Sequence, residues 1–122
     1  MANVKVLVSD KLSEAGIKVL EDAAGVDVDY KPGISEDELV SIIGEYQGLV
    51  VRSGTKVNAR VIEAGTQLKV IGRAGIGVDN VDVPAASRRG IVVMNTPTGN
   101  AVTTAEHALT LLLSLARKIP NA

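Results

Sequence analysis

Five short runs of β-branched and aliphatic residues, separated by segments with helical spacing, most constrain the fold of this chain. The runs are Val4–Ser9, Val26–Tyr30, Gly48–Val51, Lys69–Gly72 and Ile91–Asn95. Regular alternation of strand and helix signals is typical of βαβ units, whose strands form a parallel sheet with helices on both faces. The second run alternates valine with aspartate, which suits an edge strand. The sequence therefore predicts one α/β domain over residues 1–122, with a five-stranded parallel sheet in the flavodoxin-like order 2-1-3-4-5.

The helices between these strands have recognisable start signals. Helices are expected over Ser13–Ala23, from Ser35 onward, and over Asn58–Ala64, Val83–Arg88 and Thr103–Lys118. Ser35 with Glu38, and Thr103 with Glu106, have the spacing of a capping box, in which side chains bond the free N–H groups of a first helical turn. Pro120 is expected to stop the last helix.

Composition excludes several classes of function. The net charge is -1, and two tyrosines are the only aromatic residues, so the chain lacks the basic patches and stacking platforms of nucleic-acid readers. It has no cysteine and hence no disulfide framework. The most apolar stretch, Ala105–Ala116, is too short to span a membrane. We therefore expect a cytoplasmic protein with an aliphatic core and with neither nucleic acid nor membrane as a partner.

Polar and glycine-rich loops follow the predicted strands at their carboxyl ends, where parallel sheets bind ligands. Arg52 and Ser53 follow the third strand, Gly75 and Gly77 the fourth, and Asn100 the fifth. A guanidinium beside hydroxyl, amide and glycine backbone groups suits a carboxylate or phosphate. Arg52 could instead be a solvated loop residue, and the glycines could only serve a turn that needs positive φ. Their combination favours a small anion as the ligand.

Other kinds of site are disfavoured. The run Gly75–Asn80 has asparagine where a dinucleotide fingerprint needs its third glycine, and it follows the fourth strand instead of the first. The loop after the first strand, residues 9–12, resembles no FMN phosphate loop, and Arg52 stands where a receiver domain needs its phosphoacceptor aspartate. His107, the only histidine, lies within a predicted helix and is expected to be packed or on the surface. We expect no catalytic residue and no metal site.

The last predicted helix is apolar around most of its circumference. Its leucines and alanines leave little polar surface, so it needs cover on more than one side. That cover could come from its own domain, or from a second domain or a second chain.

Four segments resemble, in order and spacing, motifs of the D-2-hydroxyacid dehydrogenases: Val51–Ser53, Gly72–Asp82, Met94–Pro97 and Thr104–His107. The pairing of Gly-Arg-Ala-Gly with Val-Met-Asn-Thr-Pro-x-Gly-Asn is most similar to the D-3-phosphoglycerate dehydrogenase group. The resemblance covers essentially the whole chain. It implies the substrate-binding part of a two-domain oxidoreductase that converts 3-phosphoglycerate to 3-phosphohydroxypyruvate with NAD, at the entry to serine biosynthesis.

The same resemblance assigns roles to individual residues. The substrate-binding residues it implies are Arg52, Ser53, Gly75, Ile76, Gly77 and Asn100. Ile76 and Thr104 would lie beside the nicotinamide end of NAD. The family's catalytic Arg, Glu and His and its pyrophosphate-binding glycines belong to sequence beyond Ala122, so we expect this chain to be inactive alone and to bind NAD only weakly. The helix 103–118 matches the family's segment that crosses into the nucleotide-binding domain.

Three interpretations stay open: a dehydrogenase fragment, a free-standing α/β anion-binding module, and a polypeptide made to study folding or fold evolution. For the last helix we expect one of two arrangements. It folds back onto its own sheet, or it is exchanged in a homodimer.

Overall fold

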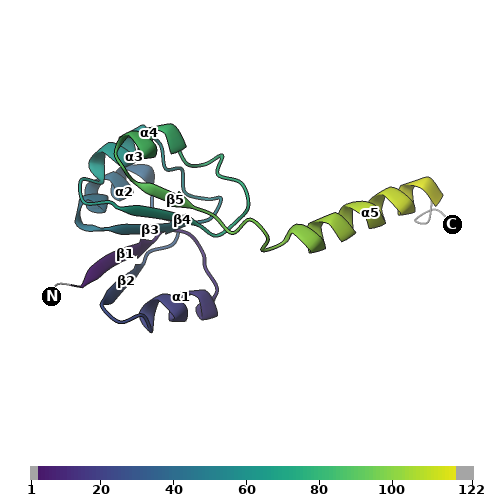
Figure 1. The fold of residues 1–122 in the computed structure, drawn as a ribbon, viewed down its shortest axis with the longest axis horizontal. Helices are drawn as coiled ribbons and strands as arrows, with labels where there is room; N and C mark the ends of the chain where they lie inside the picture. The colour runs from purple at the N-terminus through teal and green to yellow at the C-terminus, as the bar shows by residue number, and fades with distance from the viewer. Residues whose placement is uncertain (1–2, 118–122) are drawn as a thin grey trace.

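The computed structural model describes residues 3–117 and contains a five-stranded parallel sheet (Figure 1). The strands are β1 (Val4–Val8), β2 (Val26–Tyr30), β3 (Gly48–Val51), β4 (Val70–Arg73) and β5 (Val92–Met94). Their order is β2-β1-β3-β4-β5, and every neighbouring pair is parallel. The predicted α/β class and strand order are confirmed, including the edge position of the valine–aspartate strand.

The helices are distributed unevenly over the two faces of the sheet. They are α1 (Glu14–Glu21), α2 (Glu36–Ile42), α3 (Ala59–Ala64), α4 (Val83–Arg88) and α5 (Ala101–Arg117), with a 3-10 turn η1 (Ile43–Glu45) after α2. In Figure 1, α2, α3 and α4 lie together on one side, and α1 lies on the other. α5 projects away from the sheet as an isolated rod.

Short polar side chains start four of these helices. Each accepts a hydrogen bond from the backbone N–H three residues further on, at distances of 3.0–3.2 Å. These N-caps are Ser13, Ser35, Asn58 and Asp82. Because the first N–H groups of a helix have no partner within it, such caps explain why the helices begin where they do.

The start of α5 differs from the prediction. The helix begins at Ala101, so Thr103 lies inside it and the capping box expected at Thr103 and Glu106 is wrong. The N–H of Thr104 donates to the carbonyl of Asn100 at 2.9 Å, which places a helical bond one turn earlier than expected. Alanine at the first position favours this extension. The predicted end at Lys118 and the stop at Pro120 lie outside the described residues.

The face under α2–α4 is closed. One row of cross-strand neighbours runs along it: Leu7, Leu49, Ile71 and Val93. The first three are at most 1% exposed, and Val93 packs against the core that they form with the helices. This aliphatic core, with Tyr46 as its only aromatic member among the described residues, holds the sheet rigid beneath the loops at its carboxyl end.

The opposite face is closed only under α1. The adjacent row runs through Val8, Val50, Gly72 and Met94, and exposure rises along it from 1% at Val8 to 55% at Met94. A hollow of about 330 Å³ lies over this row, and we call it the open groove. Its lining is mainly apolar and includes Leu12, Gly16, Val19, Leu20, Val50, Gly72 and Met94.

In this structure α5 does not fold back onto its own sheet, so the first of the two expected arrangements is wrong. The segment before the helix is bonded to the loop after β4. The Asn95 amide donates to the carbonyl of Ile76 at 2.7 Å, and the Thr96 N–H donates to the carbonyl of Gly75 at 2.9 Å. The chain leaves the sheet from this point, so α5 starts at the rim and runs outward (Figure 1). Within residues 3–117, no helix is long and apolar enough to cross a membrane.

Candidate functional site

The loops at the carboxyl ends of β3, β4 and β5 enclose a hollow of about 360 Å³, which we call the rim hollow. All seven residues assigned to substrate or nicotinamide from the sequence line it: Arg52, Ser53, Gly75, Ile76, Gly77, Asn100 and Thr104. Arg73 and Ala74 complete the lining. Parallel strands bring these loops to one edge, although the residues come from three separate segments between positions 52 and 104.

Arg52 presents most of its guanidinium to solvent. One of its terminal nitrogens donates to the carbonyl of Lys11 at 3.2 Å, and this is the only hydrogen bond of the side chain within residues 3–117. A guanidinium carries five N–H donors in a planar fork. The remaining donors, next to the exposed Ser53, can therefore bind a carboxylate or phosphate in two-point fashion.

The loop Gly75–Gly77 has a structural role in addition to any role in ligand binding. A Cβ added at Gly75 would lie 2.8 Å from a terminal nitrogen of Arg73, so the missing side chain makes room for that guanidinium. Neither Gly75 nor Gly77 has positive φ, so the alternative of a left-handed turn is wrong. The N–H groups of Ile76 and Gly77 donate to no acceptor in the described part of the chain. Those two groups are available to an anion.

Arg73 is a site residue that the sequence reasoning missed. Its side chain is 11% exposed. It donates to the carbonyl of Arg52 at 3.3 Å and to the carbonyl of Gly77, and its other terminal nitrogen lies 3.8 Å from the Asp79 carboxylate. Because its donors are occupied by two loops, Arg73 holds the wall of the rim hollow together, which leaves Arg52 as the guanidinium free for a ligand. Its position at the end of β4, directly before the glycine loop, could have identified Arg73 as a site residue from the sequence.

Asp10 lies directly behind the Arg52 loop. Its carboxylate accepts hydrogen bonds from the N–H of Arg52 at 2.7 Å, and from the N–H and hydroxyl of Thr55 at 2.9 and 2.8 Å. Burial alone raises the pKa of Asp10, but these hydrogen bonds outweigh burial and hold its pKa below the usual value. Asp10 is therefore a buried anion that organises the loop and is not available as a proton donor.

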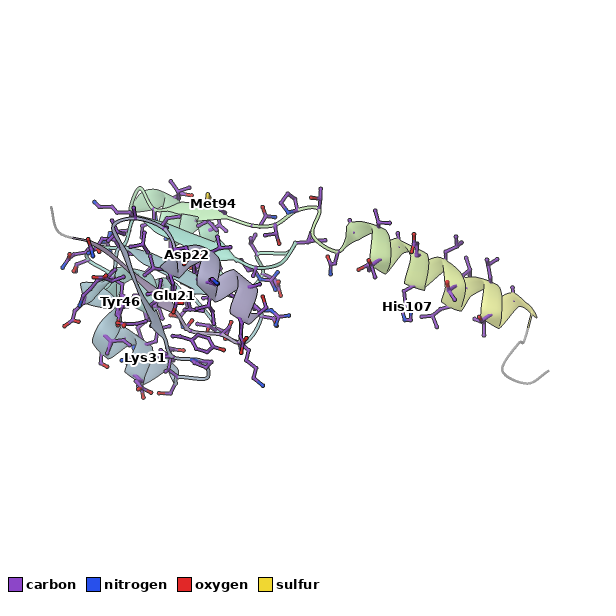
Figure 2. The ribbon with its side chains drawn as sticks, turned by 90° about the horizontal axis from the view of Figure 1, so that it is seen from below. Glu21, Asp22, Lys31, Tyr46, Met94 and His107 are labelled. Atoms are coloured by element: carbon purple, nitrogen blue, oxygen red, sulfur yellow. The ribbon has the colours of Figure 1, made fainter. Side chains whose placement is uncertain are left out.

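The start of α5 also contributes to the rim hollow, through Thr104 in its first turn and Asn100 immediately before it. His107 lies one turn further along and is exposed on the isolated helix, away from the sheet (Figure 2). It has no acid–base partner among residues 3–117. In the same residues, no group of three His, Asp or Glu side chains is close enough to hold a metal ion.

A parallel flavodoxin-like sheet with a hollow at the carboxyl ends of its strands is the architecture in which α/β domains bind small ligands. Residues 6–114 match the family described as D-isomer specific 2-hydroxyacid dehydrogenase, catalytic domain. The chain belongs to this family. The resemblance noted in the sequence is thereby confirmed.

Among curated proteins, the chain is 56% identical over 118 residues to D-3-phosphoglycerate dehydrogenase of Synechocystis and 52% identical over 119 residues to that of Archaeoglobus fulgidus. These matches cover 97% and 98% of this chain but only 21% and 22% of the relatives. The chain thus spans about a fifth of the length of the relatives it matches.

Solved structures share the fold of this chain. A protein from Pyrococcus horikoshii superposes with a TM-score of 0.86 at 32% identity, over 96% of this chain and 34% of its own. A cofactor (NAD+)-bound 3-phosphoglycerate dehydrogenase from Entamoeba histolytica superposes with a TM-score of 0.80 at 31% identity, over 93% of this chain and 39% of its own.

Proposed function

We propose that this chain is the substrate-binding portion of an NAD-dependent D-3-phosphoglycerate dehydrogenase, and that the rim hollow is the protein's half of the substrate site. The observation that carries the proposal is the convergence of Arg52, Ser53 and the free N–H groups of Ile76 and Gly77 on one hollow of about 360 Å³. Donors of this kind bind carboxylates and phosphates, and 3-phosphoglycerate carries both.

The described residues fit only one end of NAD. Ile76, 41% exposed, and Thr104 line the rim hollow and would contact the nicotinamide. When bound, NAD supplies the hydride acceptor. The loop after β1, residues 9–12, contains no glycine cradle for a pyrophosphate. We therefore propose weak contact with NAD and no turnover by this chain alone.

Calorimetric titration with 3-phosphoglycerate tests the proposal. We expect measurable binding by the unmodified chain and at least about 10-fold weaker binding by Arg52→Gln, because a hydrogen bond to a charged group contributes about 1.5–3 kcal/mol. Arg60→Gln is the matched control, since Arg60 bonds Glu36 and Asp37 on α2 and does not line the rim hollow. Absence of binding, or equal binding by both variants, would contradict the proposal.

A stand-alone anion-binding module is the second candidate, and the exposed N–H groups of Ile76 and Gly77 are compatible with it. Addition of NAD separates the two. A dehydrogenase fragment should bind 3-phosphoglycerate more tightly when NAD contacts Ile76 and Thr104, whereas a simple anion module should be indifferent. Production of NADH by this chain would show that the expected inactivity is wrong.

We also propose that α5 is the segment that, in longer members of the family, crosses into the nucleotide-binding domain. Its leucines are exposed here, from 55% at Leu113 to 77% at Leu115. A free helix so apolar requires a partner surface. We also propose a cytoplasmic location, in keeping with the absence of cysteine.

For the chain by itself we propose a homodimer in which α5 of each copy lies in the open groove of the other. Both surfaces are apolar and uncovered in one copy, and exchange would cover both. Asn100 and Thr104, at the start of α5, line the rim hollow in this structure, and an exchange that keeps this start in place leaves them there. Light scattering after size exclusion measures the mass directly. A monomer that persists at high concentration would rule out the exchange.

A further inference from the structure

The turn that follows β3, residues 52–55, is held from below by one carboxylate. Asp10, two residues after β1, accepts from the N–H of Arg52 with one oxygen, and the same oxygen accepts from the N–H of Thr55. Its other oxygen accepts the Thr55 hydroxyl, which also lies 2.9 Å from the Ser9 hydroxyl. Both ends of the four-residue turn are thus tied to the segment that follows β1.

Gly54 makes this approach possible. A Cβ at Gly54 would lie 2.8 Å from an oxygen of Asp10, closer than side chains tolerate. Gly54 does not have positive φ, so its backbone would accept alanine without strain. The position therefore reports on one thing, the space that the Asp10 carboxylate occupies.

The same turn is held from above by the loop after β4. The amide of Asn80 donates to the carbonyl of Arg52 at 2.5 Å and to the carbonyl of Thr55 at 2.8 Å. Both hydrogens of one amide nitrogen are thereby directed to the two ends of the turn. Arg73 adds its bond to the carbonyl of Arg52 at 3.3 Å.

We propose that Asp10 and Asn80 are positioning residues for the anion site, acting through the backbone of Arg52 and Thr55. Asp10 bonds the N–H groups and Asn80 bonds the carbonyls of the same two residues, so together they fix the turn from opposite sides. Neither residue lines the rim hollow, whereas Arg52 and Ser53, the first half of the turn, do. This role rests on the proposed function for the identity of the ligand.

Substitution of Asp10 or Asn80 should therefore change the affinity for the ligand, although neither residue lines the rim hollow. A turn that is free to move presents Arg52 and Ser53 in several positions, and only a fraction of the molecules is then ready to bind. The bonds from Asp10 and Asn80 to the turn, which we call the clamp, keep that fraction high. Loss of the clamp lowers affinity in proportion to the fall in that fraction.

Titration of five variants with 3-phosphoglycerate tests the role. We expect Asp10→Ala, Asn80→Asp and Gly54→Ala each to weaken binding about 10-fold. Asp10→Asn should recover much of the loss, because an amide oxygen can still accept from the N–H groups of Arg52 and Thr55. In the double variant Asp10→Ala, Gly54→Ala, the second change should add nothing, since the carboxylate that the new methyl group would strike is gone.

Asp29→Asn is the matched control. Asp29 also accepts a short hydrogen bond, at 2.6 Å from the Tyr46 hydroxyl, but it lies on β2 away from the turn. A loss of affinity in this control equal to that in Asp10→Ala would mean general destabilisation and would overturn the role. Unchanged affinity in Asp10→Ala or Gly54→Ala would overturn it as well.

A second measurement separates this role from the proposed function. The amide NMR signals of Arg52 and Thr55 should shift as Asp10 is protonated in acid, and should move in Asn80→Asp but not in Asp29→Asn. If the unmodified chain binds no 3-phosphoglycerate while these signals behave as expected, the proposed function fails and the clamp remains. If the signals are unaffected by Asn80→Asp and by protonation of Asp10, the clamp fails whatever the chain binds.

Discussion

Two adjacent cross-strand rows of the same sheet are buried to very different extents. In the row Leu7–Leu49–Ile71–Val93, every side chain packs into the core under α2–α4. In the row Val8–Val50–Gly72–Met94, burial falls away beyond the cover of α1 until Met94 is 55% exposed (Figure 2).

The contrast is sharpest within β5. Val93 packs against the core, whereas its neighbours Val92 and Met94 point to the other face and are 57% and 55% exposed. Side chains alternate between faces along a strand, so three consecutive apolar residues indicate a strand meant to be covered on both sides. The amino-acid pattern of β5 therefore indicates a covering partner, and within residues 3–117 the folded sheet does not supply one.

The largest difference should appear on truncating side chains of the two faces. Ile71→Ala, at a fully buried site, should lower the free energy of unfolding by about 3 kcal/mol, because it removes buried methyl groups and leaves a cavity. Val92→Ala, on the open face, should lower it by less than about 0.5 kcal/mol. Urea unfolding at low protein concentration measures both. Equal losses would mean that the open face is covered in solution.

A smaller loss of unfolding free energy is expected when a buried side chain on the packed face keeps its shape but loses a hydrogen bond. Tyr46 is 3% exposed and donates to Asp29 at 2.6 Å, so Tyr46→Phe should cost about 1.5 kcal/mol. Burial, together with the Asp29 carboxylate, raises the pKa of Tyr46 to about 12. The stabilisation is therefore complete below the ordinary tyrosine pKa of about 10 and is lost as pH rises through about 12.

Unfolding at increasing alkalinity checks this directly. Stability of the unmodified chain should decline between about pH 10 and pH 12, and Tyr46→Phe should lack that part of the decline. Identical alkaline curves for both proteins would contradict it.

Two strand glycines on the less covered face give a finer test. A Cβ at Gly72 meets no atom within 4 Å, whereas a Cβ at Gly48 would lie 3.1 Å from a methyl group of Val6. At a protein concentration low enough to keep the chain monomeric, Gly72→Ala should raise the free energy of unfolding by about 0.5 kcal/mol, because alanine restricts the unfolded chain. Gly48→Ala should be neutral or destabilising by up to about 1 kcal/mol. A destabilising Gly72→Ala would show that the open groove is occupied.

The smallest effect on folding should come from α5. Leu112 is 62% exposed, so Leu112→Lys should change the free energy of unfolding of the monomer by less than about 0.5 kcal/mol. It should nevertheless abolish any dimer, because a charge would enter the apolar contact. His107→Lys, which places a charge at an exposed polar position of the same helix, is the control and should leave the mass unchanged. A dimer that survives Leu112→Lys would place the interface elsewhere.

Much of the fold and of the candidate site follows from local sequence. The strand order, the caps at Ser35 and Asn58 and the loops of the rim hollow were predicted correctly, because hydrophobic periodicity and cap chemistry act within a few residues. The false capping box at Thr103 and Glu106 shows the limit of that approach. Several neighbouring residues could have started this helix, and in the structure it begins at Ala101.

The sequence alone determined the parallel sheet, its aliphatic core and the kind of chemical groups at its carboxyl edge. Only the tertiary structure decided that Gly75 accommodates Arg73, that Asp10 and Asn80 hold the Arg52 turn, and that α5 leaves the open groove uncovered. The physical reason is distance along the chain. Asp10 and Arg52 are separated by 42 residues, and hydrogen bonds or steric contacts between such segments exist only once the sheet has brought their ends together.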